Sequence, residues 1–129
     1  MRAKDFISEA TLKGKVVGDG IAVSAYVDGK LAGTYEYKDN RHLADVKAEY
    51  QQQGIGSLLL LKLLDIASDN KIPVYRDESE TSAYQALVDS LENKQYIIVD
   101  DEEDELMISN VGYKWLKKQE QQWEQDSLS

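Results

Sequence analysis

The sequence contains no cysteine and only one proline among its 129 residues. Without cysteine, the chain cannot form a disulfide, a zinc–thiolate site or a thiol nucleophile. Its leucine run, Leu58–Leu61, is interrupted by Lys62, far short of the roughly 20 apolar residues of a membrane helix. The first residues, 1–6, lack the apolar stretch and small-residue cleavage site of a signal peptide. We therefore expect a cytoplasmic protein with no membrane partner.

Positive charge is scarce: 15 Lys and Arg face 24 Asp and Glu, which gives a net charge of −9. Proteins that track phosphates need a basic surface, so direct nucleic-acid binding is not expected. The electrostatic field of this net negative charge favours cationic partners. The length and the 42 % hydrophobic fraction predict one globular domain.

The first half of the chain is rich in β-forming residues. Ile21–Val27 and Leu31–Tyr37 flank Asp28-Gly29, a pair typical of the two-residue turn of a β-hairpin. Further strands are expected within 7–17, 42–49, 72–75, 96–99 and 106–109.

Helical periodicity begins at Gly56, where leucines form a wide stripe through about residue 69. Asp77 and Glu80 resemble a capping box that opens a second helix, and a third is expected from Tyr113 to about Gln125. A helix between the 42–49 and 72–75 strands implies a parallel pair. The predicted fold class is therefore α/β (α+β), with a mixed, mostly antiparallel sheet and a central parallel strand pair.

The domain is expected to span residues 1–112, and 113–129 to add a C-terminal helix and a frayed tail to it. Trp115, Leu116 and Trp123 of this helix either cover the core or form the seam of a homodimer.

The segment Val46–Ser57 joins a strand end, a polar turn with two glycines and a helix start. Glycine lets a ligand approach the main chain, and the first amides of a helix bind phosphate well. The alternative is a tight turn whose glycines serve only packing. A P-loop lysine and a three-glycine dinucleotide fingerprint are both missing.

This segment resembles motif A of the GNAT acetyltransferase superfamily, Gln/Arg-x-x-Gly-x-Gly/Ala, at Gln51, Gly54 and Gly56. The lead-in at Val46, Glu49 and Tyr50 agrees, as do Ser57, the leucine-rich helix and the order of the elements. The resemblance implies a GNAT fold with acetyl-coenzyme A as acyl donor. It also implies that main-chain groups from Val46 to Ala48 pair with the pantetheine arm. The pyrophosphate would be held by the amides of Gln52, Gln53, Gly54, Ile55, Gly56 and Ser57.

The catalytic residues depart from the family pattern. The family often places a proton-donating tyrosine where this sequence has Leu91 or Ser90, and Tyr84 lies two turns earlier on about the same face. Tyr84 is the candidate acid, with a packing role as the alternative. For the base, Asp39, His42 and Glu49 stay open; Glu49 is the candidate, and a solvated side chain is its alternative.

Two further features bear on the acceptor. The two helices that the family usually places between its first two strands are reduced or absent, because Lys15 and Ile21 lie too close together. The acidic run 100–105 is either a solvated hairpin loop or a surface that recruits a basic acceptor. It lacks the pattern of a calcium loop, so no metal is expected.

Three functions follow for the sequence. The first is transfer of an acetyl group from acetyl-coenzyme A to a cationic amine, either a small amine or a protein lysine or N-terminus. The second is a catalytically weak or inactive GNAT-fold binding module. The third is an acidic decoy that binds a basic nucleic-acid-binding protein.

Overall fold

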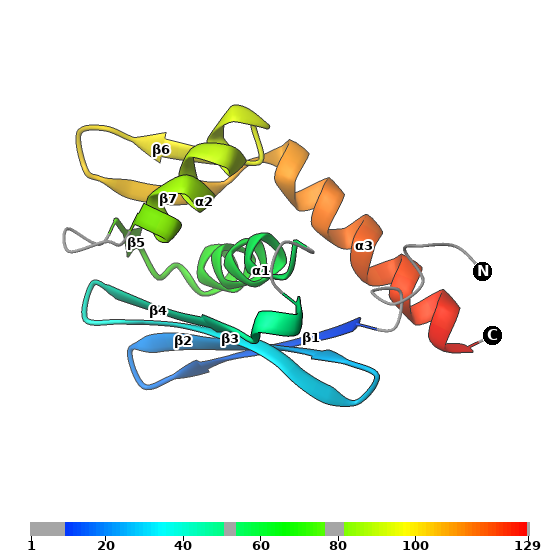
Figure 1. The fold of residues 1–129 in the computed structure, drawn as a ribbon. Helices are drawn as coiled ribbons and strands as arrows, with labels where there is room; N and C mark the ends of the chain where they lie inside the picture. Colours follow the sequence, from blue (N-terminus) through cyan, green and yellow to red (C-terminus); the bar gives the residue numbers. More distant parts are fainter. Residues whose placement is uncertain (1–9, 51–53, 77–81, 129) are drawn as a thin grey trace.

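The computed structural model describes residues 10–50, 54–76 and 82–128, in which two antiparallel sheets lie on either side of a central helix (Figure 1). No helix in these ranges is both long enough and apolar enough to cross a membrane. In chain order the elements are β1 (Ala10–Val17), β2 (Gly20–Val27), β3 (Lys30–Lys38), β4 (Arg41–Val46), the 3-10 helix η2 (Ala48–Tyr50), α1 (Ile55–Asn70), β5 (Val74–Tyr75), α2 (Ser82–Asn93), β6 (Ile97–Asp100), β7 (Glu105–Ile108) and α3 (Asn110–Leu128).

The first four strands form an antiparallel meander in the order β1-β2-β3-β4. The turn between β2 and β3 has positive φ at Asp28 (54°) and Gly29 (77°), and that between β3 and β4 at Asp39 (54°) and Asn40 (62°). Positive φ at both turn residues matches the twist of a hairpin. The hairpin predicted at Asp28-Gly29 is confirmed.

The expected central parallel strand pair is wrong. β5 pairs antiparallel with β7, in a second sheet of order β5-β7-β6, and no backbone ladder joins it to β4. The reason is that the backbone of Tyr75 bonds to side chains of the first sheet: its N–H donates to Tyr37 Oη (3.1 Å) and its carbonyl contacts His42 Nε2 (2.6 Å). The predicted α+β class agrees with the structure, but the predicted mixed sheet does not, because the described strands form two sheets in which every pair is antiparallel.

The expected loss of helices between the first two strands agrees with the described chain, because Gly18-Asp19 alone links β1 to β2. The last helix begins at Asn110, three residues earlier than predicted, since Ser109 Oγ accepts a hydrogen bond from Gly112 N–H (3.0 Å). The predicted capping box at Asp77 and Glu80 lies outside the described residues.

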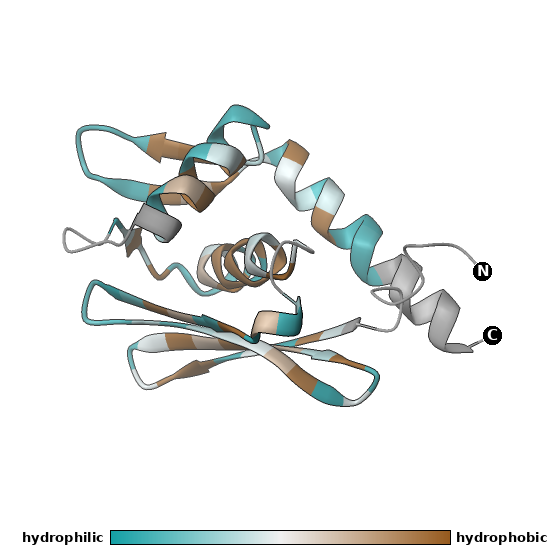
Figure 2. Ribbon diagram, viewed as in Figure 1, coloured by the Kyte–Doolittle hydropathy of each residue, from teal (hydrophilic) through white to brown (hydrophobic). Residues whose placement is uncertain are grey.

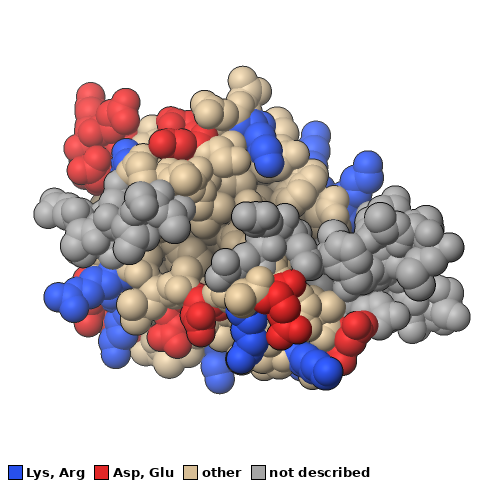
Figure 3. Space-filling view, viewed as in Figure 1, with Lys and Arg blue, Asp and Glu red and all other residues tan. Residues whose placement is uncertain are grey.

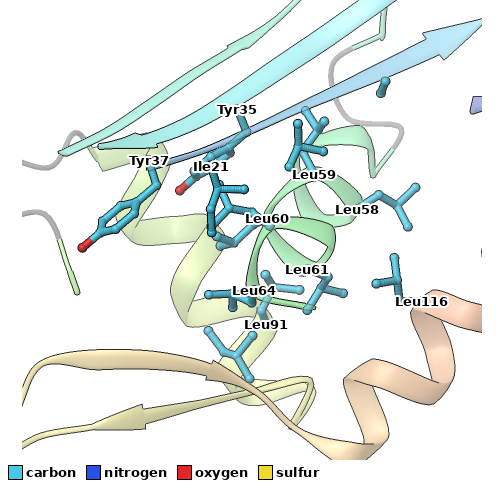
Figure 4. Close-up of a cluster of buried hydrophobic side chains, with 14 of the residues drawn as sticks. Ile21, Tyr35, Tyr37, Leu58, Leu59, Leu60, Leu61, Leu64, Leu91 and Leu116 are labelled. Atoms are coloured by element: carbon cyan, nitrogen blue, oxygen red, sulfur yellow. The ribbon is translucent and has the colours of Figure 1, made fainter. Parts of the chain in front are cut away.

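The core is built around α1, whose leucines are buried on almost every side because sheets and helices surround it (Figures 2 and 4). α3 covers part of it: Leu116 is fully buried and Trp115 stacks on Tyr96, with ring centroids 5.0 Å apart. Asp65, the buried carboxylate of α1, pairs with Lys117 Nζ at 3.1 Å. Trp115 and Leu116 thus help to cover the core, while the side chain of Trp123 is not among those described.

Candidate functional site

The start of α1 leaves backbone amides pointing outward. Its N-cap residue, Gly54, has φ 83° and gives no side-chain cap, and the first helical bond runs from Leu58 N–H to Gly54 O (3.1 Å). The amides of Ile55, Gly56 and Ser57 precede that bond and have no acceptor inside the helix. The helix dipole adds positive potential at this end, which therefore suits an anion.

Few atoms of the described residues surround the start of α1. A Cβ on Gly54 would meet nothing within 4 Å, and one on Gly56 would meet only Leu87 Cδ2, at 3.9 Å. Gly54 has to be a glycine because of its positive φ. Gly56 has no positive φ, so there the missing side chain only leaves space beside the helix. The predicted contributions of Gln51, Gln52 and Gln53 lie outside the described residues.

The outer edge of β4 presents main-chain groups. Gly33 of β3 lies opposite Val46, and Lys47 N–H donates to Ala32 O (2.9 Å). Bonded and non-bonded pairs alternate in an antiparallel ladder, so the N–H and C=O groups of Ala44 and Val46 point away from β3. β4 is the last strand of its sheet, and no described strand lies on that edge.

The face of β4 that looks toward α1 carries His42, Ala44 and Val46, because alternate residues share a face. Their partners on β3 identify this face: Tyr35 lies opposite Ala44 and is fully buried. Yet Ala44 itself is exposed, while His42 and Val46 on either side are half-buried. The inner face of β4 is therefore open to solvent along its middle.

β4 and the first turns of α1 converge on Gly33. A Cβ there would lie 3.2 Å from Val46 Cγ2 and 3.3 Å from Leu59 Cδ1. The 3-10 helix η2 turns the chain after β4 through the bond from Tyr50 N–H to Lys47 O (2.8 Å). The exposed strand edge and the helix start thus belong to the same end of the molecule.

Two predicted site residues, Ala48 and Glu49, lie on η2 and are exposed. The carboxylate of Glu49 is therefore carried by a short turn next to the end of β4.

Helix α2 borders the same region. Tyr84 is half-buried with its hydroxyl shielded from solvent, and its ring centroid lies 4.9 Å from that of His42 at 53°. Leu87, one turn later, is the side chain nearest to Gly56. One face of α2 thus extends from the start of α1 to the beginning of β4. Leu91, where the family often has its tyrosine, is buried in the core.

A hydrogen-bonded cluster of aromatic residues links the two sheets, and the sequence analysis missed it. His42 Nε2 donates to Tyr75 O (2.6 Å), because a carbonyl can only accept, and Nδ1 contacts Tyr35 Oη (2.8 Å). In the neutral ring, Nδ1 accepts from that hydroxyl. Tyr37 Oη accepts from Tyr75 N–H and donates to Asn40 Oδ1 (3.0 Å). Burial raises the pKa of Tyr37.

Part of this cluster had a signal in the sequence. A two-residue turn at Asp39-Asn40 places Tyr37 opposite His42, and Tyr35 shares the face because it is two residues away. The bonds to Tyr75 had none, since that residue lies 38 positions from Tyr37.

The acidic run forms the tip of the β6–β7 hairpin, where its carboxylates project together (Figure 3). Asp100 Oδ1 accepts from the N–H groups of Glu102 (3.0 Å) and Glu103 (3.4 Å), which shapes the turn. Arg76 N–H donates to Asp104 O (2.8 Å) and ties the tip to the end of β5. Within the described ranges, no three His, Asp or Glu side chains gather in a metal-binding group.

A model of the acetyltransferase (GNAT) domain matches residues 2–116, which is most of the chain. No curated protein matches closely enough to count as a relative. The match includes both sheets, α1 and α2, together with the first turns of α3. The chain therefore belongs to the GNAT acetyltransferase family.

Proposed function

We propose that this protein is an N-acetyltransferase that moves an acetyl group from acetyl-coenzyme A to a cationic amine. Membership of the GNAT family implies an acyl-coenzyme A donor and an amine acceptor in general; the acetyl group and the cationic acceptor are the finer part of the proposal. The observation that carries it is the start of α1 at Gly54, which offers no side-chain cap and lies at the same end of the molecule as the outer edge of β4.

The start of α1 is the proposed pyrophosphate site. Amides from Gln52 to Ser57 would donate to the phosphate oxygens, and the helix dipole supplies positive potential without a lysine cluster. This resolves the conflict between an anionic cofactor and a protein of net charge −9.

The outer edge of β4 is the proposed site for the pantetheine arm. The arm carries amides, and an extended chain with amides pairs naturally with the outermost strand of a sheet, which β4 is. Main-chain groups from Val46 to Ala48 would provide this pairing. An outward N–H of the strand, such as that of Ala44, would also polarise the thioester carbonyl where negative charge develops.

The reaction requires two protons to leave the protonated amine and one to be supplied to the sulfur. An alkylamine with a pKa of about 10.4 is mostly protonated at neutral pH, so a base must take its proton before attack. The amine nitrogen then bonds to the thioester carbon and loses its second proton, the C–S bond breaks, and the thiolate takes a proton. We assign the base to Glu49, which is exposed, and the acid to Tyr84. His42 is less suited as the base because both ring nitrogens already have hydrogen-bonding partners.

The net negative charge and the acidic β6–β7 tip support a cationic acceptor. Their field raises the local concentration of polyamines or basic peptides. A small amine and a protein lysine or N-terminus share this chemistry.

Calorimetry with acetyl-coenzyme A and a thiol-release assay with polyamines and basic peptides test the proposal together. We expect saturable binding and acceptor-dependent release of coenzyme A. Glu49→Gln and Tyr84→Phe should each lower the rate while leaving the affinity for acetyl-coenzyme A unchanged. Unchanged rates would remove these two assignments, and the absence of any binding would overturn the function.

A second candidate is a GNAT-fold binding module with little or no catalysis. It is favoured by Leu91, a buried core residue where the family often has its acid, and by the direct turn from β1 to β2. This candidate predicts heat with acetyl-coenzyme A but no thiol release with any acceptor. A protein that acts only as an acidic decoy would give neither heat nor a thermal shift.

A further inference from the structure

We propose that His42 and Tyr84 close one end of the donor site and thereby restrict the donor to short acyl groups. This inference rests on the proposed function, because it concerns the acyl chain of a thioester bound along β4. It adds a selectivity to the site: acetyl and similarly short groups are accepted, and longer chains are rejected.

The closed end of the site is rigid. The ring of His42 is fixed by bonds at both nitrogens, to Tyr35 Oη (2.8 Å) and Tyr75 O (2.6 Å). Three tyrosine rings surround it, with centroids at 5.7 Å for Tyr35, 4.9 Å for Tyr37 and 4.9 Å for Tyr84. Figure 4 shows Tyr35 and Tyr37 projecting from β3 on the side that faces α1. A ring held on both edges cannot turn aside as a leucine side chain can.

The open part of the site lies directly before this closed end. Ala44 is exposed on the inner face of β4, between half-buried Val46 and half-buried His42. Two residues of a strand span about 6.6 Å, so room at Ala44 ends within that distance at the imidazole. Tyr84, carried by α2, closes the site together with His42, because its ring packs against the imidazole.

The direction of the bound chain follows from the two ends of this site. Phosphates at Gly54 place the polar part of the donor near Val46, since Val46 and the first turns of α1 meet at Gly33. The arm then runs from Val46 toward Ala44, and the acyl group points to His42. An acetyl group adds one methyl beyond the carbonyl, whereas each further methylene presses against the ring.

The test is a binding series with coenzyme A and its acetyl, butyryl and hexanoyl thioesters, measured by calorimetry. For the wild-type protein we expect acetyl-coenzyme A to bind at least about 10-fold more tightly than hexanoyl-coenzyme A. His42→Ala should bring the hexanoyl thioester to within about 3-fold of the acetyl one, because the barrier is gone. A folded His42→Ala protein that still rejects the hexanoyl thioester would overturn the assignment to His42.

Two control variants separate shape from folding. His42→Phe keeps a ring and loses both hydrogen bonds, so it should still reject the hexanoyl thioester. Leu43→Ala changes the neighbouring residue, whose side chain is 67 % exposed on the other face, and should leave the series unchanged. If His42→Ala does not fold, the wild-type series and His42→Phe decide: equal affinity for all thioesters overturns this inference alone. If neither coenzyme A nor any thioester binds the wild-type protein, the proposed function falls as well.

Discussion

The starts of α1 and α3 differ in how their first backbone amides are capped. Each helix begins with the same backbone bond, from Leu58 N–H to Gly54 O in α1 and from Tyr113 N–H to Ser109 O in α3. At α3, Ser109 Oγ also accepts from Gly112 N–H (3.0 Å) and donates to Gln95 O (2.5 Å). At α1, the corresponding residue is a glycine with no side chain to offer.

The other end of α1 makes the contrast sharper. Lys71 adopts φ 56°, its N–H reaches Ser68 O (3.3 Å), and Ile72 N–H reaches Ala67 O (2.9 Å). The carbonyl end of α1 is thus closed by the chain itself, whereas no described side chain caps the amide end. A serine cap fits a helix start that only has to be stable, and a bare glycine fits one that binds an anion.

The largest expected effect is a loss of stability from a substitution in the middle of α1, away from its start. Leu60→Ala removes a fully buried side chain and should lower the free energy of unfolding by about 2–5 kcal/mol. Chemical denaturation measures this loss, and Leu43→Ala on the exposed surface should change stability by less than about 0.5 kcal/mol. The affinity of the folded Leu60→Ala protein for acetyl-coenzyme A should stay near the wild-type value, and a parallel loss of both would erase the distinction.

The next effect tests the glycine at the start of α1. Gly54→Val forces a β-branched residue into φ 83° and distorts the amides, so affinity for acetyl-coenzyme A should fall about 100-fold, or about 2.7 kcal/mol. Gly18→Val is the matched control, because Gly18 also has positive φ (61°) and nothing within 4 Å of its Cβ position. Both variants should lose about 1–3 kcal/mol of stability. Equal affinities in calorimetry would contradict the role of Gly54.

The serine cap should matter for stability alone. Ser109→Ala removes the acceptor of Gly112 N–H and should lower the free energy of unfolding by about 1 kcal/mol. Thermal or chemical denaturation measures the loss. Affinity for acetyl-coenzyme A should not change, and a weakened affinity would mean that the two helix starts are not independent.

The smallest effect concerns alkaline pH and the sheet that faces α1. Burial raises the pKa of Tyr37 above its ordinary value of 10.0, so the unfolded chain loses this proton at lower pH than the folded one. Stability from this group is therefore complete below pH 10 and is lost as pH rises through the folded pKa. Unfolding curves from pH 9 to 11 should show a shallower decline for Tyr37→Phe than for the wild-type protein.

Local features of this fold were predictable from the sequence because they depend on neighbouring residues. Asp28-Gly29 predicted its hairpin since few residues accept positive φ at both positions. The glycine turn before α1 was predicted because glycine accepts positive φ, which Gly54 adopts. The prediction for the end of β4 was less accurate. Apolar Ala48 suggested that the strand continues to Glu49, but the bond from Tyr50 N–H to Lys47 O turns the chain into a 3-10 helix.

Contacts between distant elements were not predictable from local patterns. A crossover helix suggested a parallel pair, but the backbone of Tyr75 bonds instead to Tyr37 and His42. The ring contact between His42 and Tyr84 likewise depends on how α2 packs. The proposed phosphate end of the site could thus be expected from sequence, whereas its proposed acyl end required the structure.

The meander order of β1 to β4 has a consequence for how the chain folds. Each of these strands pairs with the next one in the chain across a two-residue turn, so the pairs form with little loss of loop entropy. Contacts of short sequence separation form quickly. We therefore expect the strand edge that would hold the cofactor arm to form early, before the helix that would bind its phosphates packs against it.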